Sequence, residues 1–304
     1  MKKIITYLFC LILGCLEAQQ LPQYSQYMLN QMAINPAVAG INDFAEVRSN
    51  NRLQWVGITD APRTYVLTLE GPVANKNMGI GMNLFTDITG PTRRTGLNFS
   101  YAYHLKINKE VNLSMAASGG ILQWGIDGNK LTLKDEGDRQ LLTTYQTTYV
   151  PDFGMGLCLY KKGEYYLGFS IPQIYQAPIK LYEGAYKNSK VVTQVNLNGA
   201  YMFKLDDDFK IEPSFLFKYE FPAPPKIDIG VRGIYKDQIW AGTAYRHKDA
   251  VSMLLGYMYQ DYLLVGYSFD FNTTKLKNYY SGTHEVMLGI RFSKKQAATW
   301  EKSK

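Results

Sequence analysis

Strict alternation of large apolar side chains with small or polar ones is the feature that most constrains what this chain folds into. Over residues 95–107 the odd positions from Leu97 onward are apolar or aromatic, and the even positions are Gly, Asn, Ser, Ala, His and Lys. A period of two residues places these two sets on opposite faces of a β-strand. The same period recurs over residues 209–220 and 262–271. The sequence therefore predicts strands with one large apolar face and one face of small and polar residues.

The composition excludes several other folds. The 304 residues are 46% hydrophobic and 14% aromatic but only 19% charged, and the mean hydropathy is −0.22. This composition does not suit a bundle of transmembrane helices, a coiled coil or a disordered chain. The formal net charge is +7. No basic block alternates with aromatic residues as a nucleic-acid groove requires, so we expect no nucleic-acid partner.

The first eighteen residues have the pattern of a signal peptide. Two lysines precede an apolar run over residues 4–16, which is too short to span a bilayer, and Ala18 offers a small residue for cleavage. We predict a signal peptide over 1–18. A lipoprotein signal modified at Cys15 remains the alternative, although the leucine before Gly14 is not the favoured small residue. After cleavage at Ala18 only Cys158 remains, which excludes an internal disulfide and a cysteine-based zinc cluster.

No later apolar stretch approaches the length of a membrane helix. A membrane-embedded mature chain must then be a closed β-barrel, because only helices and closed barrels satisfy every backbone group in lipid. We predict an all-β protein, a transmembrane antiparallel β-barrel of about fourteen strands over residues 44–292. An N-terminal periplasmic or plug segment over 19–43 precedes it, and a basic C-terminal tail over 293–304 follows. The candidate strands lie near residues 44–55, 63–71, 78–86, 94–107, 111–126, 150–160, 165–171, 191–204, 209–220, 227–235, 238–246, 250–259, 262–271 and 284–292.

The connections between the candidate strands differ at the two ends. Every second connection is a short polar turn, such as Asn108-Lys109-Glu110, whereas the long connections 127–149, 172–190 and 272–283 fall at the other end. Outer-membrane barrels have short periplasmic turns and longer outer loops. We therefore expect outer-membrane lipid as the surroundings, with both termini periplasmic. A soluble β-sandwich or propeller is the alternative, but here large aromatic residues fill the same face of strand after strand.

The segment before the first candidate strand is expected to form a short helix. Tyr24, Tyr27, Met28 and Gln31 can share one side of a helix that Asn35-Pro36 ends. Such a helix is too short to be stable alone, so we expect it to dock against the barrel or inside its lumen.

No catalytic group emerges from the sequence. His104 falls on an inward strand face, His247 in a turn and His284 at the start of a strand, and Ser281 near His284 has no third member of a triad. The run Asp206-Asp207-Asp208 lacks the spaced oxygen ligands of a calcium loop. We predict no enzyme activity, no catalytic residue, no metal site and no cofactor.

A series of short motifs, in order along nearly the whole mature chain, resembles the PorP/SprF family of type IX secretion system membrane proteins. Each motif alone is weak, and their order makes the resemblance fairly specific. The motifs are Gln26-Tyr27, Asn35-Pro36-Ala37 with Gly40, Arg52, Gln54-Trp55, Ala61-Pro62-Arg63-Thr64, Pro151-Asp152-Phe153-Gly154, Tyr166-Leu167-Gly168-Phe169-Ser170-Ile171-Pro172, Glu212-Pro213-Ser214, Trp240-Ala241-Gly242, Tyr245-Arg246, Gly266-Tyr267-Ser268-Phe269-Asp270 and Gly282-Thr283-His284-Glu285.

The resemblance implies an outer-membrane barrel of Bacteroidota that acts with the type IX secretion and gliding motility machinery. Its implied partners are proteins of that machinery and a large adhesin encoded nearby, whose export or surface anchoring such proteins support. The function class that remains open beside it is a passive porin or small-molecule uptake channel, because the inward faces mix small residues with charges.

Six residues of these motifs are candidates for partner contact or for a structural role: Asn35, Pro36, Gly40, Arg52, Gln54 and Trp55. Trp55 ends the first candidate strand near a membrane interface, where an indole is commonly an anchor. The second interpretation makes Arg52 and Trp55, with the segment from Asn35 to Gly40, a surface for a secretion partner. The sequence leaves both interpretations open.

Overall fold

A computed structural model describes residues 22–74, 76–131, 145–180, 189–221, 223–274 and 280–292 of the chain. The predicted signal peptide, the lipidation alternative at Cys15 and the basic tail lie outside these residues. The described strands are β1 (Ala45–Leu53), β2 (Arg63–Pro72), β3 (Met78–Thr89), β4 (Thr92–Lys106), β5 (Val111–Asp127), β6 (Tyr145–Lys161), β7 (Tyr165–Ile171), β8 (Gln194–Tyr201), β9 (Phe203–Lys204), β10 (Phe209–Glu220), β11 (Lys226–Tyr235), β12 (Ile239–Arg246), β13 (Ala250–Tyr259), β14 (Leu263–Asn272) and β15 (Thr283–Phe292).

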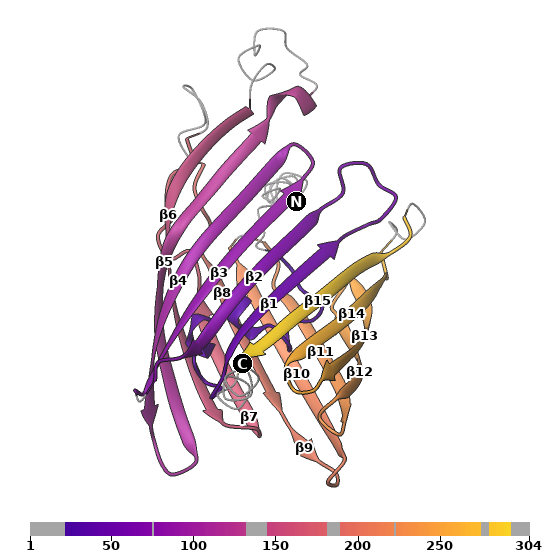
Figure 1. Cartoon of the computed structure of the whole chain (residues 1–304). Helices are drawn as coiled ribbons and strands as arrows, with labels where there is room; N and C mark the ends of the chain where they lie inside the picture. The colour runs from indigo at the N-terminus through magenta and orange to yellow at the C-terminus, as the bar shows by residue number, and fades with distance from the viewer. Residues whose placement is uncertain are drawn as a thin grey trace, which may run out of the picture.

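These strands form one closed antiparallel barrel (Figure 1). Each strand pairs with its sequence neighbour, and β15 pairs with β1 to close the sheet. The two-residue β9 continues the line of β8 beyond a break at Met202, since both pair with β10. The barrel wall is therefore fourteen strands around, which confirms the predicted fold class.

The turns at one end of the barrel are short because their residues adopt positive φ values. Lys236 and Asp237 between β11 and β12 have φ values of 53° and 55°, and Gln260 and Asp261 between β13 and β14 have φ values of 45° and 59°. Two consecutive positive φ values are those of a type I′ turn, whose twist matches that of the flanking strands. The short polar turns thus fix the register of the hairpins that they join.

The two faces of the wall are those that the alternation predicts. In β6, Phe153, Met155 and Leu157 are exposed on the outer face, while Cys158 between them and the turn is completely buried. The outer face also carries aromatic pairs near the turn end, such as Phe209 with Tyr235, whose ring centroids are 4.7 Å apart. An outward apolar band with aromatic residues at its edge is typical of a barrel surrounded by lipid.

The long connections gather at one end of the barrel, here called the loop end, and the short turns at the other, the turn end (Figure 1). The loop end holds the connections 128–144, 172–193 and 273–282. Ala45 at the start of β1 pairs with Phe292 at the end of β15, so both lie at the turn end. No helix in the described part of the chain has the length and apolar character needed to cross a membrane.

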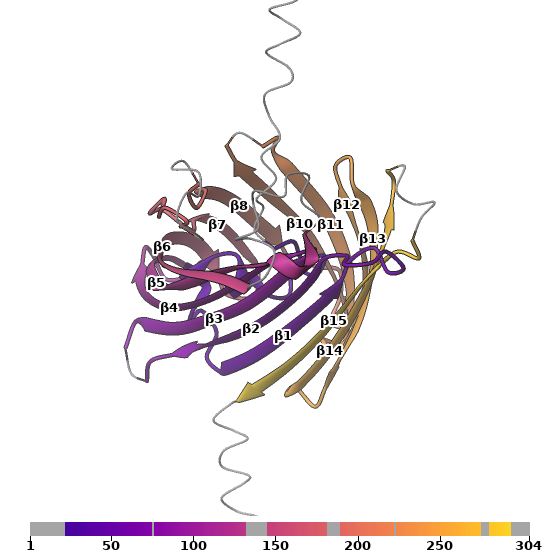
Figure 2. The same ribbon diagram turned by 90° about the horizontal axis from the view of Figure 1, so that it is seen from above.

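The N-terminal segment lies inside the barrel, where Figure 2 shows it surrounded by the strands. Its backbone forms hydrogen-bonded turns and two 3-10 helices, η1 (Gln31–Ala33) and η2 (Pro36–Val38). The predicted short N-terminal helical segment is present as these turns and 3-10 helices and not as one continuous helix, because Asn35 with its extended backbone separates η1 from η2 and caps η2. We call residues 22–41 the plug.

The plug crosses the lumen from one end to the other. The Pro22 carbonyl accepts a hydrogen bond from Lys218 near the loop end of β10, at 3.1 Å. At the other end Asp43, just beyond the plug, forms an ion pair of 2.7 Å with Lys162 in the turn after β6. The first and last described residues, Pro22 and Phe292, consequently lie at opposite ends of the barrel. The expected periplasmic position of both termini concerns residues outside the described ranges and stays a prediction.

Candidate functional site: the plug and its anchors in the lumen

The wall of the lumen is shaped to receive the plug backbone. Gly40 has a φ of +76°, and the position of a Cβ on Gly79 of β3 would overlap the Ala39 carbonyl. A Cβ on Gly156 of β6 would likewise overlap the Asn35 side chain. The small inward residues of the alternation therefore allow close approach of the plug to the wall.

Apolar plug residues fill the middle of the lumen. Tyr27, Met28, Leu29 and Ile34 form one cluster with wall residues that include Leu216 of β10. The Tyr27 hydroxyl is 3.0 Å from the Ser214 hydroxyl, so even this aromatic side chain has a polar partner. Burial of these side chains is the main source of the plug's stability in the lumen.

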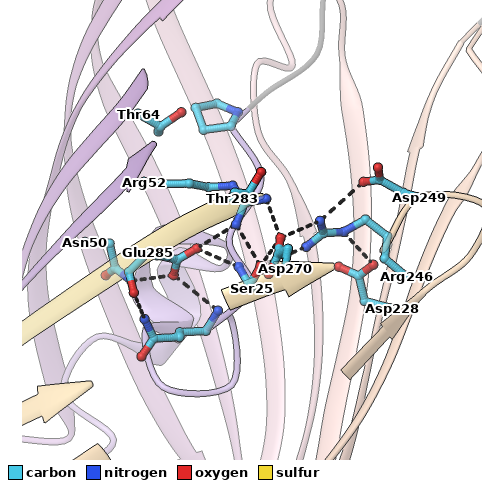
Figure 3. Close-up of polar contacts among 12 residues, drawn as sticks. Ser25, Asn50, Arg52, Thr64, Asp228, Arg246, Asp249, Asp270, Thr283 and Glu285 are labelled. Carbon is cyan, nitrogen blue, oxygen red and sulfur yellow. Dashed lines mark hydrogen bonds and ion pairs between the residues drawn. The ribbon is translucent and has the colours of Figure 1, made fainter. Parts of the chain in front are cut away.

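The strongest polar contacts of the plug converge on Ser25, near the loop end (Figure 3). Its hydroxyl lies 2.7 Å from Oδ1 and 2.8 Å from Oδ2 of Asp270 on β14, to which it donates. The same hydroxyl oxygen accepts hydrogen bonds from Arg52 of β1 at 2.7 Å and from Arg246 of β12 at 3.4 Å. One plug serine therefore joins charged side chains from three wall strands.

The Glu285 carboxylate on β15 binds the plug backbone. It accepts hydrogen bonds from the backbone N–H groups of Ser25 at 2.8 Å and Gln26 at 3.2 Å. The carboxylate also accepts from the Asn50 amide at 3.1 Å and pairs with Arg52 at 3.2 Å. Glu285 is completely buried, and these four partners satisfy its charge, as a buried carboxylate requires.

Arg246 extends this cluster across the lumen. It forms ion pairs with Asp228 of β11 at 3.0 Å, with Asp249 at 3.3 Å and with Asp270 at 3.5 Å. Arg52 completes the cluster through a 2.7 Å ion pair with Asp270. We call Ser25, Arg52, Asp228, Arg246, Asp249, Asp270 and Glu285 the Ser25 network. Its two arginines face four carboxylates, so the removal of either arginine leaves buried negative charge without a partner.

Two further anchors hold the plug nearer the turn end. The Asn30 amide donates to Asn50 at 2.8 Å and its carbonyl accepts from Thr68 at 3.0 Å. The Asn35 amide donates to the backbone carbonyls of Leu157 and Phe169, at 2.9 and 3.4 Å. Polar anchors are thus spread along the whole length of the plug.

The structure separates the six residues singled out from the sequence into two groups. Asn35, Pro36, Gly40 and Arg52 all lie in or against the plug; Asn35 and Arg52 are buried there. Gln54 and Trp55 lie instead in the connection after β1, at the loop end. The backbone N–H of Trp55 donates to the Thr283 hydroxyl at 3.2 Å, and its ring lies 6.4 Å from that of Tyr280. Partner contact through any of these six residues stays a prediction.

Sequence reasoning missed most of the Ser25 network as a unit. Arg246, Asp270 and Glu285 occur in the quoted motifs, and all three fall on the inward face of their strands. A charged residue on a buried face needs an opposite charge nearby, and that signal was available. The sequence did not show which strands supply the opposite charges, since β1 lies far from β12 and β14 along the chain.

The described residues show no arrangement of a catalytic site. The Nδ1 atom of His284 forms a hydrogen bond of 2.8 Å with the Tyr267 hydroxyl on the outer face of the barrel. The Ser281 backbone N–H bonds to the Val56 carbonyl. Among the described residues, no group of three or more His, Cys, Asp or Glu side chains is placed to hold a metal ion.

Comparisons with solved structures show which proteins this chain is similar to. Solved barrels that the chain resembles in fold include the Pseudomonas putida toluene transporter TodX, with a TM-score of 0.50, 9% sequence identity and coverage of 86% of this chain and 92% of that chain. A Pseudomonas aeruginosa FadL homologue has a TM-score of 0.48 and 12% identity and covers 91% and 95% of the two chains. The outer-membrane protein Omp33 of Acinetobacter baumannii has a TM-score of 0.45 and 9% identity and covers 84% and 99%.

No curated protein matches the sequence significantly. The family model for "Type IX secretion system membrane protein PorP/SprF" matches residues 16–290. That range includes the plug, the Ser25 network and nearly every strand of the barrel. The chain therefore belongs to the PorP/SprF family of type IX secretion system membrane proteins.

Proposed function

We propose that this protein is a non-enzymatic outer-membrane component of the type IX secretion and gliding machinery. In this role it supports the export or surface anchoring of secreted substrates, with a large adhesin encoded nearby as the expected one. The observation that carries the proposal is the family match over residues 16–290. The lipid-facing outer surface of the barrel agrees with it.

The proposed orientation places the turn end in the periplasm and the loop end at the cell surface. It rests on the segregation of short turns and long loops, which is usual in outer-membrane barrels. With this orientation Phe292 faces the periplasm and Pro22 faces the cell exterior. A periplasmic partner then meets the short turns, where Lys76, Lys109 and Lys162 lie around one hollow.

The test is surface proteomics of a deletion strain beside the same strain complemented with the intact gene. We expect one or more type IX substrates to disappear from the surface of the deletion strain and to return on complementation. Crosslinking from cysteines placed at Lys109 and at Gly90 adds a matched comparison, because these residues lie in turns at opposite ends of the barrel. We expect machinery proteins to be captured from position 109 in preference to position 90.

A passive porin is the alternative function. It predicts an unchanged set of surface proteins and a lower uptake of a small solute in the deletion strain. That result would reject the secretion role. The plug disfavours free diffusion through the structure described here, because it occupies the lumen from the loop end to the turn end.

A further inference from the structure

We propose that the barrel is a plug-gated aqueous pore. When residues 22–41 leave the lumen, the wall that they cover conducts hydrated ions and small hydrophilic solutes. This inference concerns the lumen alone and stands or falls independently of the secretion role.

The wall behind the plug has the chemistry of a pore lining. Its inward positions carry many hydroxyl, amide and charged side chains instead of the apolar residues that would best complement an apolar plug. Among the described inward-facing residues, acidic and basic side chains occur in similar numbers: Glu46, Glu70, Asp87, Asp152, Glu212, Glu220, Asp228, Asp270 and Glu285 face Arg48, Arg52, Arg94, Lys210, Lys218, Lys226, Arg232, Arg246 and Arg291. A lumen lined by charges of both signs can hold water and hydrated ions.

Several wall groups have no hydrogen-bond partner in the protein while the plug is present. Asn198 of β8 is completely buried, and neither atom of its side-chain amide has a partner. The hydroxyls of Ser114 and Ser268, also completely buried, have none either. A buried polar atom without a partner costs about 1–3 kcal/mol in general. Hydration of an open lumen removes that cost, so the wall chemistry favours an alternative state without the plug.

The plug can move without breaking the barrel. None of the described strand pairings involves a residue before Ala45, so the plug contributes nothing to the hydrogen-bonded ladder of the wall. Its polar connections to the wall are side-chain and backbone contacts that include those of Pro22, Ser25, Gln26, Tyr27, Asn30, Ile34 and Asn35. Displacement therefore exchanges plug contacts for water and leaves the fourteen-strand wall closed.

Cavities already extend into the lumen from both ends. A cavity of about 410 Å³ at the turn end is lined by Met28 and Leu29 of the plug and by Trp240 and Met258 of the wall. A smaller cavity of about 70 Å³, toward the loop end, is lined by Tyr24 and other residues. The part of the plug between these two cavities closes the route through the lumen.

Conductance of the purified protein in planar lipid bilayers tests the proposal. The variant S25A/N30A/N35A removes three polar anchors of the plug and changes no wall residue. If each anchor raises the ratio of closed to open channels roughly five- to tenfold, the triple variant occupies the open state about a hundredfold or more above wild type. The matched control is Gln31→Ala, because the Gln31 amide bonds only to Met28 within the plug; we expect it to behave as wild type.

A disulfide between the plug and the wall makes the test reversible. The ideal Cβ position on Gly266 of β14 lies 3.5 Å from Cδ of Gln26, so cysteines at these two positions can meet. In a C158S background, we expect the oxidised Q26C/G266C lock to silence the triple anchor variant and a reducing agent to restore its conductance. Wild-type openings as frequent as those of the triple variant, or conductance that the lock does not suppress, would each overturn the proposal. So would a triple variant that stays silent while its gel migration remains that of a folded barrel.

Discussion

Arg52→Met is the perturbation whose effect follows most directly from the Ser25 network. The Arg52 guanidinium donates to Ser25, Asp270 and Glu285 at 2.7, 2.7 and 3.2 Å, and its side chain is 2% exposed. Methionine keeps most of the volume and removes the charge. The two carboxylates then lose their shared cation, and we expect the free energy of unfolding to fall by about 3–5 kcal/mol, the usual cost of breaking a buried ion pair.

A second substitution separates this electrostatic cost from a general packing defect. In R52M/D270N one of the two orphaned negative charges is gone, and the asparagine can still accept from Arg246. We expect the double variant to be more stable than R52M by about 1–2 kcal/mol, although D270N alone destabilises the wild type. Arg63→Met is the matched control, because Arg63 is an exposed arginine of the neighbouring strand β2, and its effect should stay within about 0.5 kcal/mol.

Urea unfolding of the barrel in detergent micelles, followed by tryptophan fluorescence and by heat-modifiable gel migration, provides the measurement. A stability of R52M within about 0.5 kcal/mol of wild type would refute the reasoning. A D270N substitution that lowers the stability of R52M still further would also refute it, because repulsion between uncompensated charges could not then be the main cost.

Two further predictions concern the register of β6 and the turn-end anchor of the plug. Leu157→Arg should lower the free energy of unfolding by about 2 kcal/mol in lipid, because Leu157 faces outward. Cys158→Ser, at the neighbouring inward position, should lower it by less than about 1 kcal/mol. Equal or reversed effects in the unfolding assay would place the strand in the opposite register. Asn35→Ala should cost about 1–2 kcal/mol, since Asn35 caps η2 and binds two wall carbonyls. Gly156→Ala should cost less in the N35A background than in wild type, because its new methyl group would overlap the Asn35 side chain; strict additivity in a double-mutant cycle would argue against that contact.

Local sequence patterns determined the strands and hairpins of the barrel wall. The period of two decided which residues of β4, β6, β10 and β14 face outward, because a strand places alternate side chains on opposite faces whatever its neighbours are. The short polar turns determined the hairpins, since positive-φ turns such as Gln260-Asp261 join adjacent strands only in one register. The long loops, which all fall at alternate connections, then indicated which ends of the strands lie together. All of these are properties of neighbouring residues along the chain.

The tertiary structure decided how the N-terminal segment fills the lumen. The plug has no strong local propensity, and its turns form because wall glycines such as Gly79 and Gly156 leave space for its backbone. For this reason the sequence suggested a single helix and gave no sign that the chain crosses the barrel from the loop end to the turn end. The Ser25 network depends likewise on barrel closure, which brings Arg52 of β1 within reach of Asp270 of β14 and Glu285 of β15. Contacts between residues more than two hundred positions apart exist only once the sheet has closed, so no local pattern could assign them.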